Sequence, residues 1–387
     1  MTSRTRRSVI CAAAAWAACL LSSASLGGQA APSRALLAEE VFGNVQVLRG
    51  TTVNEFMGTM GIFSVALGMS CGDCHTTGDA KWENYADESP RKQMARAMVT
   101  MMASINDTYF GGRQAVTCFS CHRGTDRPKP TPALADFYGA PPPDDPRDIV
   151  EQAPFSPPPD EVFDRYIEVV GGAEPAAALT SISGRGTSTG YGPDGEARPF
   201  EIVSQAPNRR TTIVRSPSGD SVTTFDGRNG WMSAPFRPVA VLALSGADLD
   251  GLRLDAELSF PARIRDIAGN WRVGLPKVVD GRDVQMVQGT GVGGATVTLF
   301  FDTESGLLVR QIRYVGSPVG RLPTQVDYGD YREVAGVRVP FVWTVTWLGG
   351  RDTIELTDVQ ANVDVDPVRF AQPAPPVATP AAGAEAR

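Results

Sequence analysis

Two copies of the motif C-x-x-C-H constrain this sequence more than any other feature. The chain has 387 residues but only two histidines, and each histidine closes one motif. In this motif two thiols add across the vinyl groups of a haem, and the adjacent imidazole lies under the iron as its proximal ligand. The sequence therefore predicts two covalently bound c-type haems. The first would be held by Cys71, Cys74 and His75, and the second by Cys118, Cys121 and His122.

Zinc is the alternative cofactor that this residue set leaves open. A single C-x-x-C could be a redox dithiol, a local disulfide or half of a zinc site, and a cluster of Cys and His could make tetrahedral zinc sites. The two motifs, however, use every cysteine after residue 30 and both histidines of the chain. Complete use of both residue types favours haem over zinc.

The first thirty residues predict a signal for export. Three arginines near the start precede an apolar run over residues 9–21, and small residues follow as far as Ala30. The run is shorter than the roughly 20 residues that cross a bilayer. We therefore expect residues 1–30 to be a signal peptide and the protein to be periplasmic. A lipidated Cys19 is the alternative that would attach the protein to a membrane, although Trp16 stands where such signals carry an aliphatic residue.

Charge and histidine content exclude other classes of function. The net charge is −7 at neutral pH, and no block of Lys and Arg is present. Binding to a nucleic-acid backbone is therefore not expected. Two histidines also exclude a metal site built from three imidazoles.

Each motif is preceded by a predicted helix that carries methionines. Thr52 to Glu55 fits a capping box, and an apolar stripe follows as far as Gly68. Ser89 and Pro90 indicate the start of a second helix, which is expected to continue to Asn106. Because no histidine remains for the sixth position of either iron, methionine is the expected ligand. Most of these methionines are expected to serve packing.

The same region resembles a known family, the multihaem cytochrome c subunit bound to photosynthetic reaction centres. The resemblance covers roughly residues 41–124 and rests on 44–48, 55–60, 95–98, 105–106 and 116–124. In that family the distal methionine comes from a helix ahead of each motif. The resemblance thus implies Met60 for the first iron and Met98 for the second, with Met57 and Met101 as alternatives. It also implies photosynthetic electron transport and a reaction-centre-like partner, although the family carries two haem pairs and this chain one.

The remaining two-thirds of the chain predict a second, β-rich domain. Proline runs over residues 141–160 indicate a stiff linker between a dihaem domain, 31–140, and a β domain, 161–371, and residues 372–387 form a tail expected to be disordered. The fold class predicted is multidomain α+β: a small helical dihaem cytochrome c domain, then a mainly antiparallel curved sheet or half-barrel. A short helix over 161–171 is followed by β-rich runs at 200–203, 211–214, 284–288, 296–301, 307–314, 339–347 and 352–357. The order of elements distantly resembles lipoprotein carriers of the bacterial envelope. Few contacts are expected to cross the linker, so each part should fold by itself.

Two further patterns in the β domain have ordinary explanations. Residues 289–294 match the dinucleotide fingerprint G-x-G-x-x-G, yet they join two predicted strands instead of opening a helix, which favours a hairpin. The acidic residues Asp280, Asp283, Asp302 and Glu304 are expected to be solvated loop charges, with a cation site as the alternative.

Three functions follow from these predictions. The leading one is a periplasmic electron carrier, not an enzyme, in which two His/Met haems pass single electrons between redox partners. The first alternative is a peroxidase-type haem enzyme with one open iron. The second is a carrier of lipid or lipoprotein, with an apolar ligand in the β domain and the haems as accessories.

Overall fold

The computed structural model describes residues 34–75, 82–132, 134, 138–139, 150–190, 195–235, 237–291 and 294–377. The predicted signal peptide, residues 141–149 of the predicted linker and the last ten residues lie outside these ranges. Residues from 34 onward group into one compact unit. Within the described ranges, no helix combines the length and apolar character needed to span a membrane.

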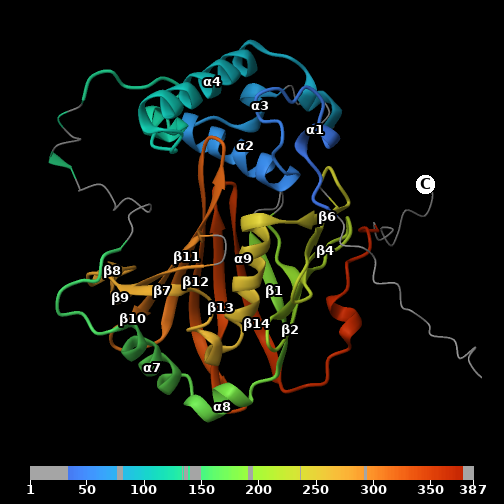
Figure 1. Cartoon of the computed structure of the whole chain (residues 1–387). Helices are drawn as coiled ribbons and strands as arrows, with labels where there is room; N and C mark the ends of the chain where they lie inside the picture. Colours follow the sequence, from blue (N-terminus) through green and yellow to red (C-terminus); the bar gives the residue numbers. More distant parts are fainter. Residues whose placement is uncertain are drawn as a thin grey trace, which may run out of the picture. The chain divides into compact units, whose positions relative to one another are not determined.

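The helical part contains both predicted helices (Figure 1). Helix α2 begins after Thr52, whose hydroxyl accepts the Glu55 N–H, and it ends at Gly68 in the left-handed conformation. Helix α4 begins after Ser89 and continues four residues beyond the predicted end, to Phe110, with Gly111 as its C-cap. The helical elements are α1 Ala38–Val41, α2 Val53–Leu67, α3 Cys71–Cys74, η1 Trp82–Ala86, α4 Pro90–Phe110 and α5 Cys118–His122.

The second part is one curved antiparallel sheet, as predicted. Its described strands run in the order β6-β5-β4-β3-β2-β1-β14-β13-β12-β11-β10-β9-β7, with β8 also paired to β9. The first strand pairs with the last, so two hairpin ladders meet at β1 and β14. The strands are β1 Ser181–Gly190, β2 Arg198–Gln205, β3 Arg209–Val214, β4 Ser221–Phe225, β5 Gly230–Ser233, β6 Val241–Leu244, β7 Gly269–Val273, β8 Lys277–Val279, β9 Arg282–Thr290, β10 Thr296–Asp302, β11 Leu308–Ser317, β12 Gly320–Val334, β13 Val337–Trp347 and β14 Gly350–Ala361. The expected hairpin near residues 289–294 is confirmed by the β9–β10 pair, although residues 292–293 lie outside the description.

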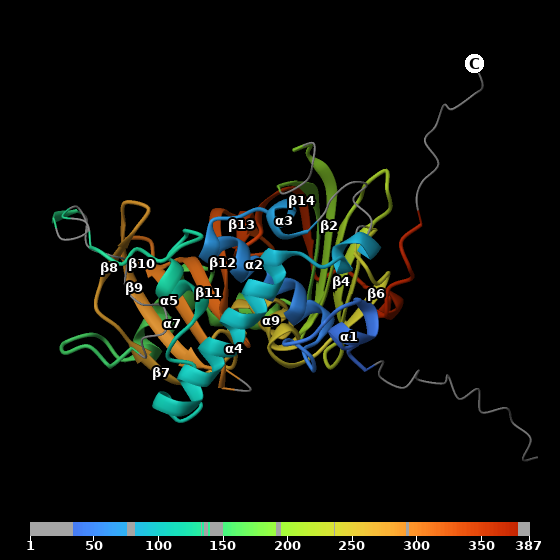
Figure 2. The same cartoon turned by 90° about the horizontal axis from the view of Figure 1, so that it is seen from above.

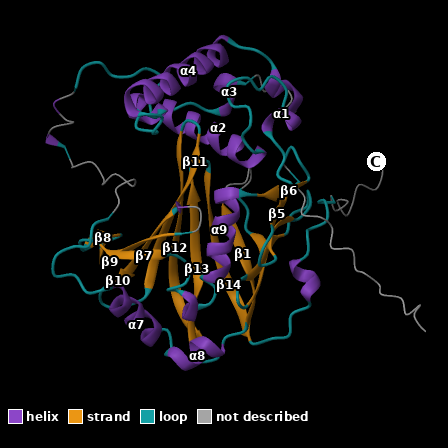
Figure 3. Ribbon diagram, in the orientation of Figure 1, coloured by secondary structure: helices purple, strands orange, loops and turns teal. Residues whose placement is uncertain are grey.

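Helices cover parts of the sheet. Helix α9 lies across one face (Figure 3) and was not predicted. Its Asp255 carboxylate accepts two hydrogen bonds from Arg313 on β11, at 2.8 and 3.1 Å, and a third from the Gln311 amide at 3.1 Å. The other helical elements here are α7 Pro159–Val169, α8 Ala173–Ala178, α9 Gly246–Glu257, η2 Pro261–Arg263 and η4 Pro367–Phe370.

The two parts contact each other extensively, so the expectation of few contacts is wrong for the described residues. Helices α2 and α4 lie over one end of the sheet (Figure 1, Figure 2). Val53 of α2 is buried with Leu242 and Leu244 of β6. The Asn54 side-chain oxygen accepts a hydrogen bond from Arg237 at 3.1 Å. The proline-rich segment therefore joins two parts that share a core.

We expect Asp255→Ala to destabilise the sheet part strongly. The Asp255 and Arg313 side chains are only 24% and 15% exposed, and loss of the carboxylate would leave Arg313 and Gln311 without their partner. Breaking such a pair costs about 3 kcal/mol of the free energy of unfolding. The exposed pair Arg263–Asp266 is the control, and Asp266→Ala should cost less than about 1 kcal/mol. Equal urea midpoints for the two variants would contradict this ranking.

Candidate haem-attachment sites

The first motif forms the short helix α3, whose N-terminus is closed by a side chain. The Asp73 carboxylate accepts hydrogen bonds from the Ser70 hydroxyl at 2.8 Å and the Ser70 N–H at 2.9 Å. It also pairs with Arg91 of α4 at 3.0 Å. These hydrogen bonds, those of Ser70 first, lower the pKa of Asp73. Cys71 at the start of α3 is exposed and Cys74 at its end is half-buried.

The His75 imidazole is oriented by a backbone carbonyl. Its Nδ1 lies 3.0 Å from the Tyr85 carbonyl oxygen, and its ring stacks on the Tyr85 ring with centroids 4.6 Å apart. Burial lowers the pKa of His75, which favours the neutral ring. A neutral imidazole that donates from Nδ1 has its Nε2 lone pair available for a metal.

The second motif repeats this arrangement on α5. Thr117 caps the helix: its hydroxyl accepts the Ser120 N–H, and the Ser120 hydroxyl accepts the Thr117 N–H at 3.0 Å. Nδ1 of His122 lies 3.0 Å from the Thr125 carbonyl oxygen. Both histidines therefore present Nε2 as a possible iron ligand, and in both the Nδ1 atom faces a backbone carbonyl.

Each motif is also tied to one of the long helices. The Ser89 hydroxyl, at the start of α4, donates to the Cys74 carbonyl at 3.1 Å. The Gly124 N–H, just after α5, donates to the Ala66 carbonyl at the end of α2 at 2.9 Å. A Cβ at Gly68 would lie 2.3 Å from the Gly124 carbonyl oxygen, so only glycine permits this approach. Helix α2, which precedes the first motif, thus packs on the second.

The methionines differ in burial. Met60 and Met98, the predicted sixth ligands, are both half-buried, and so is the alternative Met57. Met102 is only 5% exposed and belongs to the core. Met94 and Met101 on α4 and Phe119 on α5 are exposed by 61%, 47% and 51%. Large apolar side chains exposed on the helices that contain or flank the motifs are the surface that a haem would cover.

The donor set fits haem better than zinc. The four cysteines of the two motifs carry free thiols. In the described ranges, which include every motif residue, no three or more Cys, His, Asp or Glu side chains gather into a metal-binding group. The acidic loop residues likewise form no such group, and Asp280 instead pairs with Arg310 at 2.7 Å. Each motif would hold one haem, which supplies one-electron redox chemistry when bound. The residues concerned are Cys71, Cys74 and His75 in the first motif and Cys118, Cys121 and His122 in the second.

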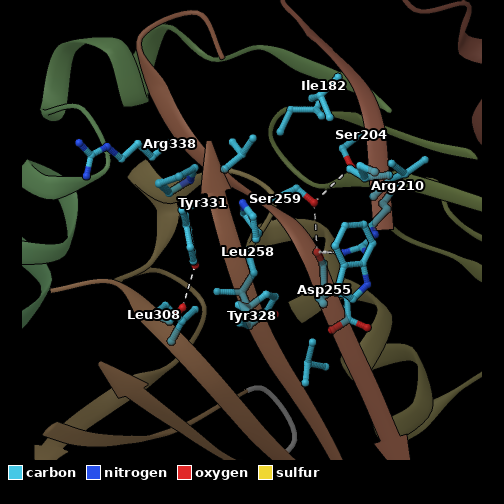
Figure 4. Close-up of a pocket in the computed structure, with 18 of the residues that line it drawn as sticks. Ile182, Ser204, Arg210, Asp255, Leu258, Ser259, Leu308, Tyr328, Tyr331 and Arg338 are labelled. Carbon is cyan, nitrogen blue, oxygen red and sulfur yellow. Dashed lines mark hydrogen bonds between the residues drawn. The ribbon is translucent and has the colours of Figure 1, made fainter. Parts of the chain in front are cut away.

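A cavity in the sheet part is lined by residues that the sequence analysis did not name, although an apolar ligand in the β domain was one of its alternatives. It has a volume of about 100 Å³ and is lined by side chains of the sheet and α9, including Val326, Tyr328 and Trp343 (Figure 4). The Tyr331 hydroxyl at its wall donates to the Leu308 carbonyl at 2.8 Å. No motif marks this site, because its residues come from strands and a helix far apart in the chain.

Comparison with known proteins shows what the helical part is similar to. Residues 21–136 match the family of the photosynthetic reaction centre cytochrome c subunit. That subunit from Rubrivivax gelatinosus is 37% identical over 114 residues, 26% of this chain and 30% of the relative. The subunit from Thermochromatium tepidum is 35% identical over 104 residues, 26% of this chain and 25% of the relative. The match thus spans a third or less of these relatives, and the predicted resemblance is confirmed for the helical part.

Solved structures similar to the other part are β proteins. A LolA superfamily protein from Nitrosomonas europaea is 15% identical with a TM-score of 0.37, and the match covers 56% of this chain and 98% of that one. A DUF1329 family protein from Desulfovibrio piger is 12% identical with a TM-score of 0.39 and the same coverage.

We predict that Met60→Ala and Met98→Ala each open one iron. Each variant should show a high-spin signal and a lower potential for one haem, because thioether ligation favours the reduced state. Electronic spectra and redox titration of the purified variants measure both effects. Met286→Ala, on β9 of the sheet part in a cluster that contains no motif residue, is the control and should leave the spectra unchanged. If the first two variants keep the original spectrum, the ligands are Met57, Met101 or other residues.

Proposed function

We propose that this protein is a periplasmic dihaem c-type cytochrome that passes single electrons between redox partners. The observation that carries the proposal is the matched pair of 3.0 Å contacts between histidine Nδ1 atoms and backbone carbonyls, one in each attachment motif. In each contact the carbonyl occupies Nδ1, so Nε2 remains available to bind a metal. The match of residues 21–136 to a cytochrome family supports the same function.

Electron transfer explains the residues better than haem catalysis. A peroxidase-type enzyme needs an open iron position and a distal acid or base. Both histidines of the chain belong to the attachment motifs, so neither is left for a distal role. His/Met coordination at both irons would close each site to oxygen chemistry and favour rapid one-electron exchange.

The partners proposed are redox proteins at the membrane or in the periplasm. The relatives named above are subunits of photosynthetic reaction centres, which makes a reaction-centre-like complex one candidate acceptor. The arginines and the apolar run before residue 30 support export to the periplasm. Lipidation of Cys19 is the alternative that would attach the protein to a membrane.

The cavity beneath α9 favours a second candidate function, the binding of an apolar ligand. Its walls are mainly aliphatic and aromatic, while Ser204, Ser259 and Asp255 form a short polar chain at one side: the Ser204 hydroxyl donates to Ser259 Oγ, and the Ser259 hydroxyl donates to the Asp255 carbonyl, each at 3.2 Å. Such a site resembles small-molecule sites in being mostly apolar with a few placed polar groups.

We expect the mature protein to contain two covalent haems. A pyridine haemochrome assay on the purified chain should give two haems per polypeptide, and denaturing electrophoresis should retain haem staining, because thioether bonds survive unfolding. Cys71→Ala with Cys74→Ala, and Cys118→Ala with Cys121→Ala, should each remove one haem. A count of one or zero, or haem that separates from the chain on denaturation, would refute the proposal.

The cavity is tested by filling it. Val326→Phe places a larger side chain in the cavity wall, and binding of the apolar dye N-phenyl-1-naphthylamine should weaken by about tenfold or more, equivalent to about 1.4 kcal/mol. Val309→Phe on the neighbouring strand, outside the cavity lining, is the matched control. Equal dye binding by the two variants would contradict ligand binding at this cavity.

A further inference from the structure

One of the two residues in the turn between β11 and β12 is buried, which is unusual for a hairpin, while the other, Pro318, is exposed. Strand β11 ends at Ser317 and β12 begins at Gly320, so the turn consists of Pro318 and Val319. Val319 is 0% exposed and Ser317 is 8% exposed. Hairpin turns normally face solvent, because water satisfies their backbone groups. Another part of the molecule must therefore cover this turn.

The covering residues belong to the haem-attachment part. Val319 shares a buried cluster with Ile62 and Ala66 of α2 and Met102 of α4, and the half-buried Met60 and Cys118 pack against this cluster. A Cβ added at Gly320 would lie 3.4 Å from Ile62 Cδ1 and 3.7 Å from Thr117 Cβ. Figure 1 shows the tip of the hairpin reaching the helices.

The polar groups of the turn are satisfied by the segment that carries the second motif. The Gln114 side-chain amide donates to the Ser317 carbonyl at 2.8 Å. The Cys118 N–H donates to the Val319 carbonyl at 3.4 Å. Cys118 is the first residue of α5, so its N–H has no partner within that short helix. The turn thus takes the place of water as the hydrogen-bond acceptor for the N–H of Cys118, the first cysteine of the second motif.

We propose that the β11–β12 turn forms one wall of the second haem site and that Val319 is a positioning residue for it. This inference rests on the proposed function. Val319 is apolar and covers the side of the second motif on which Cys118 lies, so it excludes water from that edge of the site. A drier site disfavours the extra positive charge of the oxidised iron and so raises the reduction potential. The sheet part therefore contributes more to the redox properties of the second haem than to those of the first, whose predicted ligand Met60 lies at the edge of the same cluster.

The test is Val319→Thr in the full-length, haem-loaded protein. Threonine keeps the shape of valine but replaces one methyl group by a hydroxyl that attracts water. In a redox titration followed by electronic spectra, the second haem should shift to a lower potential, and the first should shift less. To assign the shift, the same substitution in the Cys71→Ala, Cys74→Ala background, which retains only the second haem, should show it in full.

A control variant separates this effect from general loosening of the sheet. Val284 of β9 is also 0% exposed but lies in a different cluster of the sheet. Val284→Thr should destabilise the protein comparably and leave both potentials unchanged. If Val319→Thr does not fold, Gln114→Ala provides the second variant, because it removes only the hydrogen bond to Ser317, and it should shift the same haem in the same direction.

The outcomes distinguish failure of the inference from failure of the proposed function. Absence of covalent haem in the unsubstituted protein would refute the proposed function. Two attached haems with unchanged potentials in the Val319 and Gln114 variants would refute only the role of the turn. An equal shift of both haems, or the same shift in Val284→Thr, would also refute it.

Discussion

The hydrogen bond between an imidazole Nδ1 and a backbone carbonyl is the interaction on which the candidate sites depend. It occurs once in each motif, to Tyr85 and to Thr125, at the same distance of 3.0 Å. Because the acceptor is main chain, its position is fixed by the local fold instead of a side-chain rotamer. The fold must therefore hold two short segments, residues 82–86 and the turn after α5, in place. Hydrogen bonds to neighbouring residues do this: the Asn44 side chain donates to the Ala86 carbonyl at 2.9 Å, and the Gly124 N–H donates to the Ala66 carbonyl at 2.9 Å.

The sheet topology explains why the two parts of the chain are not independent. Pairing of β1 with β14 places the ladder from β14 to β9 beside the ladder from β1 to β6. The first ladder sends the β11–β12 turn to α2 and α5, and the second presents Leu242 and Leu244 to Val53. Both ends of α2 are thereby seated on the sheet. A proline-rich connection indicates extended chain between two parts but gives no information on whether those parts later pack together.

Sequence patterns predicted the starts of α2 and α4, because these depend on local chemistry, above all on N-cap hydroxyls. The attachment residues, which follow from motif spacing, stay a prediction. The patterns missed β12, the longest strand described, which contains Pro323 and Gly329. Both residues disfavour strands in isolation, and the pairing of Pro323 with Tyr314 shows that tertiary context prevails. Helix α9 was missed for a similar reason, since Gly246 and Gly251 lower its intrinsic helix propensity. The acceptor carbonyls were unpredictable, because every residue has one.

The two attachment sites have the same local chemistry but different surroundings. At the first, the Tyr85 carbonyl accepts both His75 Nδ1 and the Lys92 ammonium, the latter at 2.7 Å. A carbonyl shared with a cation is a weaker acceptor for the imidazole and leaves less electron density on the iron ligand. At the second, the Thr125 hydroxyl donates to the His122 carbonyl at 2.7 Å and makes a compact turn around the imidazole, while the sheet covers Cys118. The two copies of C-x-x-C-H thus differ in what contacts them: a charged side chain at one and an apolar turn from the sheet at the other.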